Sequence, residues 1–120
     1  MGTHWGTIAE RVVGDVVILD VSVRAISLSE GSGRLLDKIH DLLTQGWRKI
    51  LLDLLDVKYI DGFGLGEIVH GCKAAMDARG VLKLCGGQRI RDLFIANKLD
   101  RYVEVFDAEG PALASFAASQ

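Results

Sequence analysis

A nearly continuous apolar run, Ile50 to Leu55, is followed by a segment with three glycines, Tyr59 to Gly66, and then by a helix-patterned segment. Apolar runs of this length are typical of a strand that is covered on both faces of a sheet. We therefore expect a central strand, a tight glycine loop and the start of a helix in succession. Functional sites of such sheets lie beyond the carboxyl ends of the central strands, so this loop is the first place to expect one.

Two residues of the loop stand out. Asp61 precedes the helix-patterned segment, where its carboxylate can accept hydrogen bonds from unpaired amides and lies at the positive end of the helix dipole. We expect it to be an N-cap and not a catalytic acid. Phe63 is unusual because a large apolar side chain is hard to bury in a loop. It either faces solvent, where it could anchor a partner, or folds back over Val57 and Ile68.

Strand and helix patterns alternate along the rest of the chain. Two β-branched runs, Thr7 to Val13 and Val16 to Val23, flank a two-residue connection that is typical of an antiparallel hairpin. Ser27 to Glu30 has the spacing of a capping box, and helical periodicity continues from there to Gly46. We therefore expect a hairpin and then a first helix.

The second half of the chain continues the alternation. The helix after the loop extends from Gly64 to Gly80, with an apolar stripe that includes Met76 and a solvated face that includes Glu67. This order predicts one α/β domain over residues 1–120, with a mixed, mostly parallel β-sheet, an antiparallel edge and four to five helices. The remaining elements are a strand at Val81 to Cys85, a helix at Arg89 to Lys98, an edge strand at Val103 to Phe106 and a last helix opened by Pro111.

The composition argues against several functions. A net charge of −2 with both signs interspersed gives no footprint for nucleic acid, and no apolar run is long enough to insert in a membrane. The N-terminus lacks the pattern of a signal peptide, so we expect a cytoplasmic location. Cys72 and Cys85 lack metal or disulfide spacing, and we assign no metal and no cofactor. No catalytic triad or paired carboxylates can be recognised, so we expect no enzymatic activity.

Two interpretations connect this region with phosphate, one as a nucleotide-binding loop and one as a site of phosphorylation on an aspartate. The three glycines could expose amides to a nucleotide, but Glu67 occupies the third glycine position of a dinucleotide fingerprint and would repel a pyrophosphate. Asp53, at the end of the apolar run, resembles the phosphoacceptor of a response-regulator receiver domain. Magnesium would need a further carboxylate, for which the sequence offers only Asp20. A receiver-like domain that uses Asp53 therefore stays as an alternative.

The segment from Asp53 to Gly66 resembles the signature of the STAS family, the fold of the bacterial anti-sigma factor antagonists. The resemblance extends over nearly the whole chain, including the initial strand pair and the long helix before Ile50. It implies a STAS-like single domain. The positions that match the signature are Asp53, Leu54, Val57, Tyr59, Ile60, Asp61, Gly64, Leu65 and Gly66.

The resemblance implies a binding function. Proteins of this family dock the signature loop and the following helix onto a partner, often an anti-sigma factor with serine kinase activity, and phosphorylation of a loop serine breaks the complex. A homodimer is also possible. Alternatively, the chain is a non-enzymatic STAS scaffold subunit of a larger assembly, such as a stress-signalling complex or a lipid-transport ABC ATPase. The implied partner-binding residues are Asp61, Gly62, Phe63, Gly64, Leu65, Glu67 and His70.

The chain departs from the family at the switch itself. The two hydroxyl-bearing positions of the signature are Gly62 and Phe63 here, and Phe63 corresponds to the phosphorylated serine. Neither side chain can accept a phosphoryl group. We therefore expect no phosphorylation at this loop, and an antagonist without the usual switch.

Overall fold

In the computed structural model, which describes residues 6–28 and 33–117, β1 (Gly6–Val13) and β2 (Val16–Val23) form an antiparallel hairpin. Gly14 adopts the positive φ of 61° that the tight turn requires, a conformation that costs glycine little. The predicted hairpin is confirmed.

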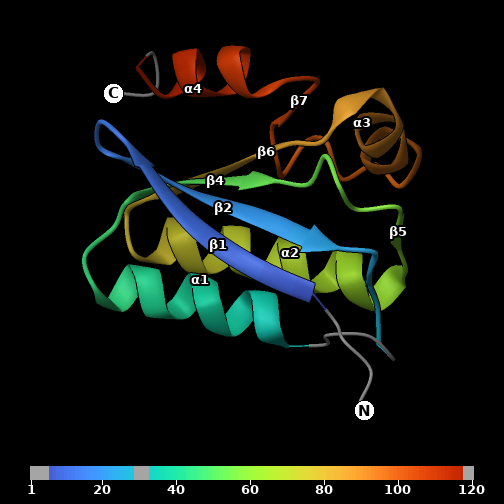
Figure 1. The fold of residues 1–120 in the computed structure, drawn as a ribbon, viewed down its shortest axis with the longest axis horizontal. Coiled ribbons are helices and arrows are strands. Elements are labelled where there is room, and N and C mark those ends of the chain that lie inside the picture. The colour runs from blue at the N-terminus through green and yellow to red at the C-terminus, as the bar shows by residue number, and fades with distance from the viewer. Residues whose placement is uncertain (1–5, 29–32, 118–120) are drawn as a thin grey trace.

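The main sheet has five strands in the order β1-β2-β4-β6-β7 (Figure 1). β4 (Lys49–Asp53) occupies the middle, followed by β6 (Val81–Cys85), and β7 (Val105–Phe106) lies at the edge. All pairs after the hairpin are parallel, as expected. The middle strand ends earlier than predicted, because Leu55 lies beyond it and is exposed.

A second sheet of two short strands was missed. β3 (Ala25–Ile26) pairs in parallel with β5 (Tyr59–Ile60). Two residues are too few to show an alternating pattern, so no sequence signal marks these strands. This small sheet matters because β5 leads directly into the helix that follows the glycine segment.

Helices cover both faces of the main sheet (Figure 1). α1 (Arg34–Thr44) and α2 (Gly62–Asp77) lie side by side on one face, and α4 (Glu109–Ala117) lies on the other. α3 (Gly87–Ala96) lies beyond the carboxyl ends of the strands, near β5 and the start of α2. The mixed α/β fold is therefore confirmed. Within the described residues, no helix has both the length and the apolar character of a membrane span.

α1 begins later than the capping-box pattern predicts. Ser27 and Leu28 precede the helix, whose N-cap is Gly33 with a φ of 85°. Gly33 offers no side chain to the first amides of α1. Ser29 and Glu30, the other half of the predicted box, lie outside the described residues.

α2 also differs from the predicted helix. It begins at Gly62, so the three glycines belong to its first turns and not to a loop. Met76, which was predicted on the buried stripe, is 68% exposed. The predicted stripe was wrong at its last position because Met76 borders a surface hollow, while Ile68, Cys72 and Ala75 are buried as expected.

The core has two parts. The larger lies between the main sheet and α1, α2 and α3, and the smaller joins Ile18 and Leu51 of the sheet to Ala112 and Phe116 of α4. Phe116 is 1% exposed and packs α4 on the sheet. These two layers give every central strand an apolar cover on both sides.

Lys83 is a charged residue inside the smaller core. Its ammonium donates to the carbonyl oxygen and the hydroxyl of Ser115 at 3.1 and 2.9 Å, and it lies 3.2 Å from a carboxylate oxygen of Glu104. It also lies 4.9 Å from the ring centroid of Phe116. A buried charge needs such partners, and these contacts hold α4 on the sheet.

The start of α2 packs against β3 backbone to backbone. A Cβ at Gly64 would lie 2.1 Å from the carbonyl oxygen of Ile26 and 2.8 Å from a methyl carbon of Ile60. A Cβ at Gly66, one half-turn further, would contact nothing within 4 Å. Only the first of these two glycines is therefore required by packing.

Gly64→Ala should lower the free energy of unfolding by about 2 kcal/mol or more, because the added methyl must push α2 away from β3. The matched variant Gly66→Ala should raise it by about 0.5 to 1 kcal/mol, since alanine favours a helix and meets open space. Urea denaturation followed by circular dichroism measures both. Equal effects of the two variants would contradict the close approach at Gly64.

Candidate functional site

Asp61 connects three segments at the start of α2. One carboxylate oxygen accepts from the amide of Gly64 at 2.9 Å, and the other accepts from the amide of Leu28 at 3.2 Å. The amide of Asp61 donates to the carbonyl oxygen of Ile26 at 3.2 Å. The predicted N-cap is confirmed, and it also fixes the segment that follows β3.

Phe63 faces solvent. It is the second residue of α2 and is 63% exposed. Val57 and Ile68 are buried in the larger core, to which Phe63 does not belong. The interpretation in which Phe63 folds back over them is therefore wrong. Its ring is held out by the first turn of a capped helix.

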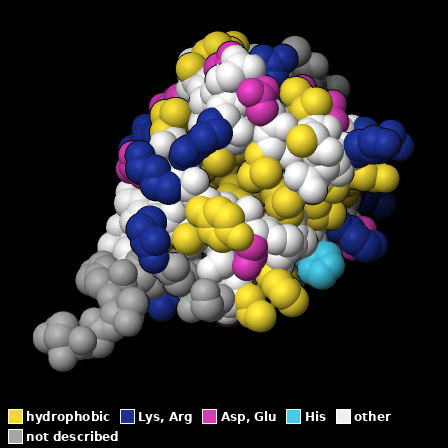
Figure 2. Space-filling model, turned by 90° about the vertical axis from the view of Figure 1, so that its right-hand side faces the viewer, with side chains coloured by type: hydrophobic (Ala, Val, Ile, Leu, Met, Phe, Trp, Pro, Cys, Tyr) yellow, Lys and Arg dark blue, Asp and Glu magenta, His cyan; other side chains and the backbone are white. Residues whose placement is uncertain are grey.

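Further exposed apolar side chains lie on the segments that meet at Asp61. Leu28 is tied to Asp61 by its amide, and Tyr59 lies two residues before Asp61 in β5. Both side chains are exposed. Figure 2 shows hydrophobic side chains gathered on the side of the molecule that carries β5, α3 and the start of α2, with basic side chains at the rim. Groupings of this kind are typical of interaction sites.

The other predicted site residues are divided between the surface and the interior. Gly64 and Leu65, in the first turn of α2, are buried, whereas Gly62 and His70 are exposed. Buried residues of this turn can support a binding surface but do not present side chains to a partner. The exposed part of the predicted site is therefore Gly62, Phe63 and His70.

Glu67 was predicted on the solvated face of its helix, but it is only 8% exposed. Its Oε2 accepts from the amide of Leu36 in the first turn of α1 at 2.8 Å. Gly33 provides no capping side chain, so Glu67 supplies a cap from a neighbouring helix. No local pattern reveals a cap that comes from so far along the chain.

Phe63 and Glu67 line a hollow between the starts of α1 and α2. The hollow has a volume of about 290 Å³ and is also lined by Leu36 and His70. Gly62 and Gly66 form part of its wall, and a Cβ on either would meet open space. The site thus combines an aromatic ring, a carboxylate and bare helix backbone.

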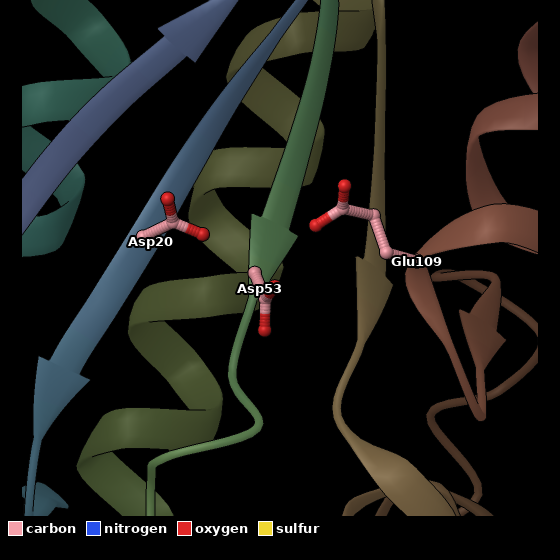
Figure 3. A group of neighbouring side chains, drawn as sticks. All are labelled: Asp20, Asp53 and Glu109. Atoms are coloured by element: carbon pink, nitrogen blue, oxygen red, sulfur yellow. The ribbon is translucent and has the colours of Figure 1, made fainter.

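A second group of polar side chains lies where the end of β4 runs beside β2, next to the start of α4 (Figure 3). Oxygen atoms of Asp20, Asp53 and Glu109 lie within 4.8 Å of one another. No paired carboxylates were recognised in the sequence, although Asp20 was considered beside Asp53, and this was wrong because Glu109 joins them from α4, far along the chain. Three such oxygens could hold a metal ion, but Arg11 already donates to Asp20 at 2.9 Å and to Glu109 at 2.5 Å.

Arg11 determines the charge state of the group. Its hydrogen bonds hold the pKa values of Asp20 and Glu109 below their usual range. Burial acts in the opposite direction on Asp53 and raises its pKa. Asp53 also accepts from the amide of Leu55 at 3.1 Å, as expected for a carboxylate at the start of a loop. The group is an ion-pair network that joins the hairpin to α4.

The sheet does not support the receiver alternative. Receiver domains have the strand order 2-1-3-4-5, whereas the main sheet here follows chain order and begins with an antiparallel pair. Asp53 therefore lies at the end of a middle strand in a different topology. We do not retain it as a phosphoacceptor.

Comparison with known proteins agrees with this topology. No protein-family model matches the chain. A protein of Thermotoga neapolitana named as an anti-sigma factor antagonist is 34% identical over 106 residues, which cover 86% of this chain and 91% of that protein. The alignment therefore spans almost the full length of both.

Solved structures share the fold. The crystal structure of an anti-sigma factor antagonist from Thermotoga maritima is 27% identical, with a TM-score of 0.77 over 90% of this chain and 92% of that one. The Bacillus cell fate determinant SpoIIAA in its phosphorylated form is 15% identical, with a TM-score of 0.66 over 92% of this chain and 99% of that one. At this identity SpoIIAA shows the fold alone.

Arg11→Met should lower the free energy of unfolding by about 1 kcal/mol at pH 7, because Asp20 and Glu109 lose a charged donor. Because the pKa values of Asp20 and Glu109 are lowered in the folded state, their ionised forms stabilise the folded protein. This stabilisation is lost as the pH falls through the pKa values that the two carboxyl groups have in the folded state. The difference from wild type should therefore shrink below about pH 4. Urea denaturation at several pH values measures it, and a difference that is constant with pH would contradict the network.

Asp53→Asn should raise the free energy of unfolding at pH 7, whereas Arg11→Met lowers it. Because the pKa of Asp53 is raised, its ionisation disfavours the folded state, and this cost appears as the pH rises above about 4 and through the raised value. Asparagine keeps an acceptor for the Leu55 amide but cannot ionise. The variant should therefore unfold at a higher urea concentration than wild type at pH 7, and at the same concentration at pH 3. A variant that is less stable at pH 7 would contradict the effect of burial.

Proposed function

Since the chain belongs to the STAS-type anti-sigma factor antagonists, we propose that it binds an anti-sigma factor through the surface around the first turns of α2. The observation that carries the proposal is Phe63, a 63% exposed aromatic side chain on a rigid helix start. The proposal implies a protein partner and a cytoplasmic location. It requires no enzymatic activity of this chain.

The surface is suited to recognition because its support is fixed. Asp61 caps α2, and Gly64 lets the helix start touch β3 directly. Phe63 therefore loses little backbone freedom on binding, and large aromatic side chains with this support are common hot spots. Leu28 and Tyr59 add exposed apolar area on the segments that meet at Asp61.

We propose that binding at this surface is constitutive. A phosphoryl group would add about two negative charges at the start of α2, in the middle of the interface. Gly62 and Phe63 have no hydroxyl to carry it. A partner with serine kinase activity would then be bound but would not release itself by modifying this loop.

Phe63→Glu should weaken binding of the cognate anti-sigma factor by at least about 30-fold, because the complex would bury an unpaired carboxylate in place of an aromatic anchor. Met76→Glu is the matched control, since Met76 is 68% exposed near the other end of the same helix. Isothermal titration calorimetry with each variant measures the affinities. Unchanged binding by Phe63→Glu would remove Phe63 from the interface.

Incubation with ATP and a kinase-type cognate anti-sigma factor should leave the intact mass of the wild-type protein unchanged. Phe63→Ser should gain one phosphoryl group at residue 63, because the new hydroxyl lies at the exposed first turn where the family carries its serine. Intact-mass and peptide mass spectrometry give both results. A phosphoryl group on any residue of the wild type would contradict unswitched binding.

A further inference from the structure

Glu67 brings a carboxylate to the hollow beside Phe63. Glu67 is 8% exposed, and its Oε2 accepts from the amide of Leu36 at 2.8 Å. Among residues 6–28 and 33–117, its other oxygen, Oε1, makes no hydrogen bond and no ion pair. A buried carboxylate gains free energy from every further donor, so this oxygen favours a ligand that brings one.

The arrangement of the hollow favours a flat ligand. Phe63, Glu67 and His70 follow one another at i, i+4 and i+7 of α2 and so lie on one stripe of the helix. Gly62 and Gly66 leave the backbone bare beside this stripe, and Leu36 of α1 lines the opposite side. A side chain that enters can contact the Phe63 ring along its length and reach Glu67 with its tip.

The chemistry selects a cation with donors in a plane. A guanidinium is always charged, places its donors in a rigid fork that matches a carboxylate, and stacks on an aromatic face. An ammonium is a compact, strongly hydrated charge that stacks poorly. We propose that the hollow binds an arginine side chain, with its guanidinium donating to Oε1 of Glu67 and lying against Phe63. That this arginine belongs to the anti-sigma factor rests on the proposed function.

An NMR titration of the isotopically labelled full chain tests this without any partner. The probe is Nα-acetyl-arginine amide, and Nα-acetyl-citrulline amide is its uncharged control of nearly equal shape. Capped arginine should shift the amide signals of Gly62, Gly66 and Glu67 saturably, with a Kd on the order of 10 mM. Capped citrulline should bind at least about fivefold more weakly.

Two variants separate the charge from the ring. Glu67→Gln keeps an acceptor for the Leu36 amide but removes the charge, and it should weaken capped arginine at least about fivefold. Phe63→Leu keeps apolar bulk but removes the ring, and it should weaken binding about two- to fivefold. The amide spectrum of each variant shows that it is folded before the titration.

Several results would overturn the proposal. These are shifts that do not saturate, shifts centred on the carboxylates around Asp53 instead of the hollow, equal binding of capped citrulline, or full binding by folded Glu67→Gln. Such a failure would leave the Phe63→Glu test with the anti-sigma factor standing. Capped arginine that binds as expected, in a protein that binds no anti-sigma factor, would contradict the proposed function alone.

Discussion

The backbone contact between the first turn of α2 and β3 is the constraint on which the site depends. Because Gly64 has no side chain, Asp61 can cap α2 with one oxygen and hold the amide of Leu28 with the other. Between residues 61 and 66, the contact with β3 constrains some positions and leaves others open to solvent. Asp61 and Gly64 are fixed by packing, whereas Gly62, Phe63 and Gly66 face open space and can vary without disturbing the fold. Gly62 and Phe63, the two positions that differ from the family signature, both belong to the group that faces open space.

Local patterns predicted most of the architecture. The hairpin, the buried middle strand and the N-cap at Asp61 each depend on residues close together in the chain, and each was found, although the middle strand ends earlier than expected. The missed strands and the missed cap have a common physical cause, which is a contact made over a long distance in sequence. β3 and β5 are too short to show a period and exist only because they pair, and the first turn of α1 is capped by Glu67 from another helix.

The candidate site shows the same limit in its side chains. The sequence indicated that Phe63 is out of place but could not decide whether its ring is covered or exposed, because that depends on where α2 begins. Glu67 was expected in solvent since it lies off the apolar stripe of its helix, yet the neighbouring helix covers it. The carboxylates around Arg11 could not be grouped either, because Arg11 and Glu109 are brought together only by the complete sheet and α4.

The position of α4 has a consequence for how the chain is made. Within the described residues, the outer faces of β2, β4 and β6, with Ile18, Leu51 and the ammonium of Lys83, receive most of their cover from residues 109–117, with Phe106 at the edge. During synthesis the strands leave the ribosome first, so a nascent chain that has already formed its hairpin and α1–α2 layer still presents an apolar sheet face to the cell. Chaperones that bind exposed strands should therefore meet this protein on that face. The ion pair between Arg11 and Glu109 can form only after residue 109 has been synthesised, and it marks the end of that interval.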